Sequence, residues 1–378
     1  MMHARRREGR YQVSDPDLFN LPFASEEFRS MPYRRLGHSG LQASAIGIGT
    51  WKFGDPASGD GSRVGGEAAQ QLLDCAYDLG VTFWDTAGRY NNASGNSERV
   101  LGQWIDRNRR VRRDIVIATK VFPLMDGLTP NHYGTSRTNV IESVYASLDR
   151  LRTDYVDVLY LHMWDESSDI EEALCAVDDL VRADLVRYMG VSNFSAEQIS
   201  RLLEVTQHGE FSRCRPAVVQ NQFDILRGEL GEFGGKGVLE LCAATPPSFV
   251  AWSPLAGGLI SDRYLDPALA SSGDRLVDEG RLDALCTSEH IRKLRRLGEL
   301  ANEVDVGITE LALAFMLAID GMGPVIAAVS SRDQLRANAS AAKLCLSRAQ
   351  LSAIAEAAVF EGPIADNNGD CWENRQAR

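Results

Sequence analysis

Three apolar runs in this chain each end at an ionisable side chain. They are Phe83-Trp84-Asp85, Ile117-Ala118-Thr119-Lys120 and Val158-Leu159-Tyr160-Leu161-His162. A buried strand does not normally lead into a charged group unless that group is needed at the strand's end. Because the three runs follow one another with helical segments between them, they favour a (β/α) barrel whose functional site lies at the carboxyl ends of the strands.

Strand-like runs alternate with amphipathic helical segments along most of the chain. Eight runs predict strands, at residues 43–47, 82–85, 115–120, 156–161, 188–192, 217–220, 248–252 and 323–329. Helices are predicted at residues 67–79, 97–108, 137–150, 170–182, 196–206, 289–303 and 309–319. This alternation indicates an α/β fold, a (β/α)8 TIM barrel with a parallel closed sheet.

We expect a single barrel domain at residues 31–360, between an extension at 1–30 and a tail at 361–378. The segment 33–41 predicts an N-terminal hairpin with a Ser-Gly turn. The connection at residues 253–288 is too long for an ordinary loop. Connections of that length are usually either functional lids or unstructured segments, and both readings stay open.

The composition limits the partners and the compartment. The chain has 378 residues and a formal net charge of −12, which argues against nucleic acid or an anionic membrane as a partner. No apolar run approaches the roughly 18 residues of a membrane-spanning helix. Seven cysteines, an odd number without a C-x-x-C pair, indicate reduced thiols and a cytoplasmic protein.

Several short motifs occur in an order that resembles the aldo-keto reductase superfamily, over residues 33–358. They are Gly47-Ile48-Gly49-Thr50-Trp51, Asp85-Thr86-Ala87 with Tyr90, Ser97-Glu98, Ala118-Thr119-Lys120, Ser147-Leu148-Asp149-Arg150-Leu151, His162, Gly190-Val191-Ser192-Asn193-Phe194, Gln220 and Trp252-Ser253-Pro254-Leu255-Ala256-Gly257-Gly258-Leu259. The resemblance implies an NAD(P)-dependent oxidoreductase that interconverts a carbonyl and an alcohol by hydride transfer.

The resemblance also implies a catalytic tetrad. Tyr90 would be the general acid–base, and Lys120 would lower the pKa of its phenol. Asp85 would pair with Lys120, and His162 would donate a hydrogen bond to the substrate carbonyl oxygen. Taken singly, each residue has a structural alternative: Asp85 as a cap, Lys120 as a surface lysine, His162 as a core histidine and Tyr90 as loop packing.

A cofactor site is implied by the same resemblance. Ser192, Asn193 and Gln220 would bind the nicotinamide carboxamide, and Trp252 would face the nicotinamide ring. The full set of expected cofactor contacts is Thr50, Trp51, Asp85, Ser192, Asn193, Gln220, Trp252, Ser253, Pro254, Leu255, Gly257, Arg263, Ser330, Arg332, Gln334 and Asn338. No metal is required by this mechanism.

The adenosine end departs from the family's pattern. Ala327-Ala328 stands where a Pro-Gly pair is common, and Ala337 stands where an acidic residue commonly precedes the asparagine. Ser330 and Arg332 open a predicted helix whose N-terminus favours a phosphate. They favour NADP(H) over NAD(H), and NAD(H) stays open.

The substrate site is expected around Trp51, Tyr90, His162 and Trp164. Two indoles near one carbonyl site indicate a small-molecule substrate with an apolar or sugar-like face. Two other functions stay open: a cofactor-binding, redox-sensing subunit like the channel β-subunits that share this fold, and a barrel that uses the tetrad for elimination or isomerisation. The sequence does not predict the substrate's identity, the physiological direction or the oligomeric state.

Overall fold

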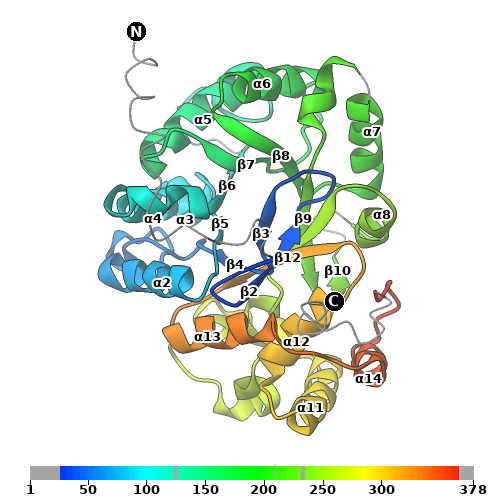
Figure 1. Cartoon of the computed structure of the whole chain (residues 1–378). Coiled ribbons are helices and arrows are strands. Elements are labelled where there is room, and N and C mark those ends of the chain that lie inside the picture. Colours follow the sequence, from blue (N-terminus) through cyan, green and yellow to red (C-terminus); the bar gives the residue numbers. More distant parts are fainter. Residues whose placement is uncertain (1–25, 123–126, 208, 231–234, 366–378) are drawn as a thin grey trace, which may run out of the picture.

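An eight-stranded parallel barrel forms the centre of the molecule (Figure 1), which confirms the predicted (β/α)8 fold. The computed structural model describes residues 26–122, 127–207, 209–230 and 235–365. The barrel strands are β4 (Ile46–Gly49), β5 (Phe83–Asp85), β6 (Val116–Val121), β7 (Val156–Leu161), β8 (Val186–Ser192), β9 (Val218–Asp224), β11 (Ser248–Trp252) and β12 (Met322–Ala328). The sheet closes where β12 pairs with β4, with Val325 opposite Ile46.

Helices surround the barrel, and they follow the predicted segments closely. They are α2 (Gly66–Asp78), α4 (Asn96–Arg107), α5 (Arg137–Leu151), α6 (Ile170–Arg182), α7 (Ala196–Gln207), α8 (Val238–Ala244), α11 (Ser288–Glu303), α12 (Ile308–Leu317), α13 (Arg332–Ala341) and α14 (Arg348–Ala358). The sequence reasoning missed α8 and α14. A readable signal for α14 was present, because Ser347 and Gln350 form a capping box at its start.

A small antiparallel sheet closes the amino end of the barrel. It consists of β1 (Glu27–Phe28), β2 (Met31–Arg35) and β3 (Gln42–Ser44). The first barrel strand was therefore placed too early, because residues 42–44 belong to the hairpin and β4 begins at Ile46. The sheet also includes the last residues of the expected extension, whereas the rest of that extension, up to residue 25, lies outside the described residues.

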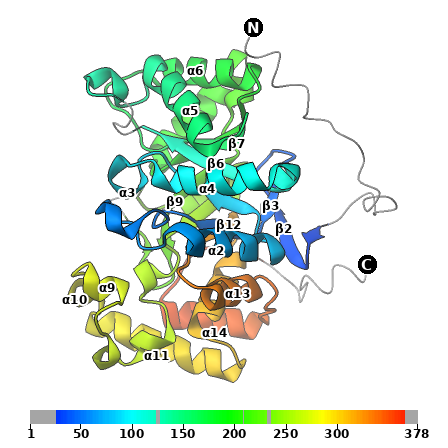
Figure 2. The ribbon, with the colours of Figure 1, turned by 90° about the vertical axis from the view of Figure 1, so that its left-hand side faces the viewer.

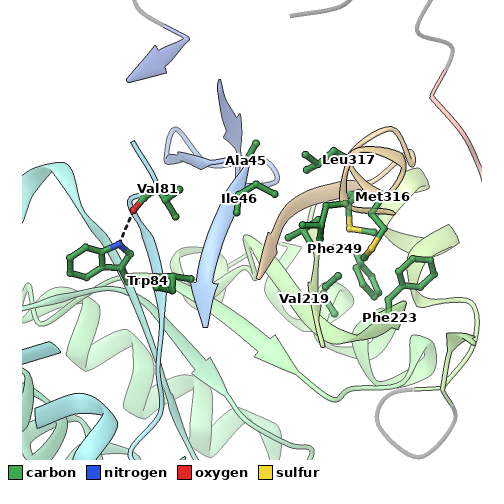
Figure 3. Close-up of a cluster of buried hydrophobic side chains, with 14 of the residues drawn as sticks. Ala45, Ile46, Val81, Trp84, Val219, Phe223, Phe249, Met316 and Leu317 are labelled. Atoms are coloured by element: carbon green, nitrogen blue, oxygen red, sulfur yellow. Dashed lines mark hydrogen bonds between the residues drawn. The ribbon is translucent and has the colours of Figure 1, made fainter. Parts of the chain in front are cut away.

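The barrel strands alternate between two environments over most of their length, as the two-residue period of a strand requires. Trp84 faces outward into the layer between barrel and helices, where it contacts Trp104 edge-on at a centroid distance of 4.7 Å. Figure 3 shows part of this layer, with Met316 of α12 beside Phe249 and Phe223. Phe83, one residue before Trp84, faces the barrel interior instead.

The interior of the barrel is apolar at its amino end and polar at its carboxyl end. The apolar cluster consists of Leu36, Ala43, Phe83, Val116, Ala118, Val158, Tyr160, Ala217, Val218, Val250 and Ile326. Leu36 and Ala43 come from the β2–β3 hairpin, so this hairpin plugs the barrel. The next inward positions on three strands are Asp85, Lys120 and Gln220, which are all buried.

Gly190 on β8 makes room for the largest side chain at the boundary between these two regions. A Cβ atom at Gly190 would lie 2.7 Å from Cε1 of Tyr160 and 2.7 Å from Cγ2 of Val218. Real Cβ atoms do not approach that closely, so only glycine fits beside the Tyr160 ring.

The long connection after β11 is an ordered series of short helical turns. It includes η6 (Ala256–Gly258), η7 (Asp262–Leu265), η8 (Pro267–Leu269), α9 (Arg275–Asp278) and α10 (Leu282–Leu285). Figure 2 shows α9 and α10 at the end of the barrel opposite to β2 and β3. Ion pairs join this connection to the loop after β4, with Nη2 of Arg63 2.7 Å from Asp278 and Nζ of Lys52 3.2 Å from Glu279.

Two further expectations concern cysteines and membranes. Cys75, Cys175, Cys214, Cys242 and Cys286 carry free thiols. Cys345 is disulfide-bonded, so the expectation of uniformly reduced cysteines is wrong at this position. Within the described ranges, no helix has the length and apolar character needed to cross a membrane.

Candidate active site

Asp85 is the centre of a buried hydrogen-bond cluster at the carboxyl end of the barrel. Nζ of Lys120 lies 2.7 and 2.6 Å from its two carboxylate oxygens. The Tyr90 hydroxyl donates to Oδ2 at 2.9 Å, and Nε2 of Gln220 donates to Oδ1 at 2.7 Å. Lys120 also donates to the Tyr90 hydroxyl oxygen at 2.8 Å and to the Thr86 carbonyl at 3.0 Å. Side chains from two other strands, β6 and β9, and from one loop therefore converge on this carboxylate of β5.

The pKa of Tyr90 is opposite in direction to the sequence-based expectation. Burial and the adjacent Asp85 carboxylate raise the pKa of the phenol well above its ordinary value near 10. Burial also lowers the pKa of Lys120, against the effect of Asp85. The expectation that Lys120 would make Tyr90 more acidic neglected desolvation, which outweighs the neighbouring ammonium here. Tyr90 is therefore held as a protonated phenol.

His162 completes the group that the sequence predicted. Its ring lies edge-on to the Tyr90 ring, at a centroid distance of 6.4 Å. Burial, followed by the nearby Lys120 charge, lowers the pKa of His162 to about 3, so the imidazole is neutral at ordinary pH. Its buried Nδ1 has no hydrogen-bond partner among the described residues.

The residues expected at the nicotinamide end come together at the ends of β7, β8, β9 and β11. Asn193 donates to the His162 carbonyl at 3.0 Å and accepts from Nε1 of Trp252 at 3.1 Å. The Ser192 hydroxyl donates to the Gln220 carbonyl at 2.7 Å. Asn193 adopts a left-handed backbone conformation, with φ 58°, which asparagine tolerates better than most residues.

Thr50 lies beneath the site and not on its surface. Its hydroxyl donates to the Asp85 carbonyl at 2.9 Å and lies 2.6 Å from Oγ of Ser97, which also contacts Oγ1 of Thr86 at 2.8 Å. Thr50 is fully buried. Its contacts fix the backbone at the end of β5, so the side chain supports Asp85 from below.

The backbone of segment 253–263 has conformations that suit the close approach of a ligand, but Arg263 already forms an ion pair within the protein. Ser253, Ala256 and Gly257 have positive φ angles, and Pro254 is buried while Leu255 is half-buried. Arg263, expected near the pyrophosphate, forms an ion pair with Asp274 of the same connection. The structure therefore places Arg263 in a contact that stabilises the connection itself.

The expected adenosine end lies at the start of α13. Ser330 is exposed, and its backbone N–H and hydroxyl both donate to Oε1 of Gln334, at 2.8 and 3.1 Å. Arg332 is exposed and donates to Gln71 at 3.2 Å. Asn338 is buried, and its Nδ2 has no partner in the part of the chain that the structure describes.

The two tryptophans of the expected substrate site differ in their surroundings. Trp51 is 43% exposed, and its ring centroid lies 6.3 Å from that of Tyr90. Trp164 packs edge-on against Phe194 at 5.4 Å, and the Arg201 guanidinium lies over it at 5.7 Å. Trp51 therefore borders the cluster directly, whereas Trp164 packs against the start of the β8–α7 connection.

Comparison with known proteins agrees with this geometry. The sequence model of the Aldo/keto reductase family matches residues 45–359. The chain belongs to this family. A probable voltage-gated potassium channel subunit beta from Arabidopsis thaliana is 31% identical over 313 residues, which cover 82% of this chain and 91% of that protein.

Aldo/keto reductases generally bind NAD(P)H, and the donor set of this chain fits such a cofactor. The buried Nδ2 of Asn338 lacks an acceptor among the described residues, and the buried Nδ1 of His162 also lacks a partner there. An unsatisfied buried polar atom is costly, so atoms of this kind commonly mark where a ligand supplies the missing bond. One of them lies at each expected end of the dinucleotide.

Sequence reasoning missed several contacts in this aldo/keto reductase site. Gln220 bonds to Asp85, a contact that depends on its rotamer and has no sequence signal. Ser97 and Thr86 appeared only as parts of family motifs, although their hydroxyls join Thr50 in one buried network. Tyr160 lies within the predicted strand 156–161, yet its buried hydroxyl lies next to the polar cluster and helps to raise the pKa of Tyr90.

Proposed function

We propose that this aldo/keto reductase is an NADP(H)-dependent enzyme that reduces the carbonyl of an aldehyde, a ketone or a sugar-like molecule. The observation that carries the proposal is the contact of the Tyr90 hydroxyl with both Lys120, at 2.8 Å, and Asp85, at 2.9 Å. A phenol placed between an ammonium and a carboxylate can give up a proton and recover one, which is what general acid–base catalysis requires.

In the direction of reduction, Tyr90 is the proton donor. Its raised pKa keeps the phenol protonated before reaction. When bound, the reduced nicotinamide supplies the hydride that adds to the carbonyl carbon. Tyr90 then donates its proton to the carbonyl oxygen, and Lys120 stabilises the phenolate that remains. An acid–base group in place contributes about 10²–10⁴ in rate.

His162 orients the substrate oxygen. Since its pKa is lowered to about 3, the neutral ring carries one N–H, which it can donate to a carbonyl oxygen beside Tyr90. A neutral donor polarises the carbonyl without releasing its own proton. Donors already fixed in place before the reaction are worth more than donors that must reorganise.

The cofactor would be held by two groups of residues, one at the carboxyl ends of β8 and β11 and the other in α13. Ser192, Asn193 and Trp252 would hold the nicotinamide end, and the start of α13 with Arg332 and Asn338 would hold the adenosine end. An exposed arginine at a helix N-terminus favours an additional phosphate, which supports NADP(H) over NAD(H).

The test has two stages. Intrinsic tryptophan fluorescence, titrated with NADPH and with NADH, is expected to show tighter binding of NADPH. A panel of aldehydes, ketones and keto sugars is then assayed for nicotinamide oxidation. Tyr90→Phe is the matched control, since it removes only the hydroxyl. We expect it to lower kcat by about 10²-fold or more with unchanged NADPH affinity.

A second candidate function is a cofactor-binding regulatory subunit, which the similarity to the Arabidopsis channel subunit beta favours. It also predicts tight NADPH binding, but no carbonyl turnover above that of Tyr90→Phe. Tight binding without turnover across the panel would therefore favour the regulatory role and contradict the enzymatic one.

A further inference from the structure

Tyr90 differs from its three partners in what holds it. Asp85, Lys120 and His162 lie on or directly after barrel strands, whose hydrogen-bond ladders fix their backbones. Tyr90 instead begins α3 (Tyr90–Ala93), a single turn in the connection after β5. The group proposed to transfer the proton is therefore the one that the sheet does not position.

The turn after Tyr90 has an unusual backbone. Asn91, Asn92 and Ala93 all have positive φ angles, of 55°, 55° and 62°. Residues with a Cβ rarely adopt this left-handed conformation, because the Cβ then lies too close to the following carbonyl oxygen. Three in succession persist only where surrounding contacts hold them, and such outliers next to a reacting group motivate a functional hypothesis.

The contact that holds the turn comes from Asn91. Its side chain is only 3% exposed, and Nδ2 donates to the Phe53 carbonyl at 2.7 Å. Phe53 is itself buried, and its N–H donates to the Thr50 carbonyl at 2.9 Å. Asn91 therefore ties the loop that carries Tyr90 to the loop after β4, next to the residue that supports Asp85.

The acceptor for Asn91 cannot easily move away. At Gly54, directly after Phe53, a Cβ would lie 2.1 Å from Oγ of Ser62 and 3.2 Å from Cβ of Asn96. Asn96 in turn donates to Asp60 at 2.8 Å. The loop after β4 therefore packs closely against the start of α4, directly beside the acceptor of the Asn91 bond.

We propose that Asn91 is a positioning residue: its bond to the Phe53 carbonyl fixes the left-handed turn and thereby holds the Tyr90 hydroxyl against Lys120 and Asp85. This inference rests on the proposed function of Tyr90. Displacement of a reacting group by about 1 Å can cost roughly 10²-fold in rate, so a single loop contact suffices to matter.

The neighbouring Asn92 offers a matched control. It is the same residue type with the same φ angle, but it is exposed and makes no side-chain hydrogen bond within the described residues. Asn91→Gly and Asn92→Gly both permit a left-handed backbone, so they differ in the loss of the buried Asn91 side chain and its hydrogen bond. Asn91→Asp, which keeps the side-chain volume but replaces the donor with an acceptor, is the second variant in case Asn91→Gly does not fold.

The first readout is kcat on the best substrate of the carbonyl panel, together with NADPH affinity. We expect Asn91→Gly and Asn91→Asp to lower kcat by about 10- to 100-fold without changing NADPH affinity. Asn92→Gly should stay within about twofold of the wild type. Equal kcat values for Asn91→Gly and Asn92→Gly would overturn the proposal.

The second readout does not depend on turnover. The ionisation of Tyr90 is followed by NMR of protein labelled at the tyrosine Cζ carbons, with Tyr90→Phe identifying its signal. Asn91→Gly should bring the pKa of Tyr90 down towards 10, because the ring leaves its half-buried place beside Asp85, Lys120 and Tyr160. Asn92→Gly should not change it.

The two readouts separate the possible failures. A wild-type protein that turns over no carbonyl contradicts the proposed function, and the Tyr90 titration then still decides the role of Asn91. A loss of kcat in Asn91→Gly with an unchanged Tyr90 titration would overturn the proposal, since the loss would not act through Tyr90.

Discussion

The two ends of the barrel interior are built from the same strands but are stabilised by different kinds of interaction. On β5, Phe83 belongs to the apolar cluster and Asp85, two residues later, is the centre of the polar cluster. On β6, Ala118 likewise belongs to the apolar cluster, and Lys120, two residues later, belongs to the polar cluster. The amino end is held by packing with the hairpin, whereas the carboxyl end is held by hydrogen bonds among buried charged groups.

This difference shows how one end depends on the other. The apolar cluster lies next to the buried Asp85, Lys120 and Gln220, and away from water each charged group depends strongly on its partner. The raised pKa of Tyr90 and the lowered pKa values of Lys120 and His162 all have burial as their largest cause. The acid–base properties of the polar end therefore depend on its burial as well as on its own charged groups.

The largest expected effect comes from breaking the polar end. Lys120→Met removes the ammonium and leaves Asp85 buried, with Tyr90 and Gln220 as its remaining side-chain donors. An uncompensated buried charge costs about 3–5 kcal/mol, and turnover should fall at the same time. Urea unfolding and steady-state kinetics on the same preparation measure both. A variant as stable as the wild type would contradict the role assigned to the pair.

A substitution in the apolar cluster should lower the stability of the fold with little change in turnover. Phe83→Ala removes a fully buried ring and should lower the free energy of unfolding by about 3–5 kcal/mol. Because Phe83 belongs to the apolar cluster and makes none of the hydrogen bonds around Asp85, kcat per folded molecule should change only a few-fold. Denaturant titration with active-site counting by NADPH fluorescence checks this, and a kcat loss as large as that of Tyr90→Phe would argue against the separation.

The pH dependence of stability should report on His162. Its pKa is about 3 in the folded protein and near 6.5 when unfolded, so the stabilisation is complete above about 6.5 and is lost as pH falls towards 3. One such proton gives a slope of up to about 1.4 kcal/mol per pH unit in that window. His162→Gln should flatten this slope. The free energy of unfolding, measured between pH 7 and 4 in both proteins, tests the assignment.

The smallest expected loss of stability comes from a substitution at Gly190, where the apolar and polar ends of the barrel interior meet. Gly190→Ala would force a methyl group against Tyr160, and such overpacking should cost about 1–3 kcal/mol. Tyr160→Leu in the same protein should recover part of the loss, since it removes the ring atoms that clash. Thermal unfolding of the two single variants and the double variant gives the coupling, and strict additivity would show that the ring is not the obstacle.

The strand-end positions of Asp85 and Lys120 were predictable because a two-residue period and an apolar run together fix which side chain faces inward. Tyr90 was not predictable in this way, since it lies in a loop and only family resemblance singled it out. The direction of its pKa shift was not predictable either, because burial depends on neighbours distant in the chain. Nothing in the sequence signals a left-handed Ala93 or the bond from Gln220 to Asp85.

The closure of the barrel has a consequence for how the protein is made. β4 is complete only when Ile46 meets Val325, so the first barrel strand must wait for the last. At about 5–20 residues per second, synthesis of the intervening chain takes roughly 15–60 s. During that time the outward-facing Ile46 and Ile48 and one edge of β4 lack their final partners. The nascent chain therefore carries an open strand edge for most of its synthesis, which makes chaperone dependence and slow, late ring closure the expected folding behaviour.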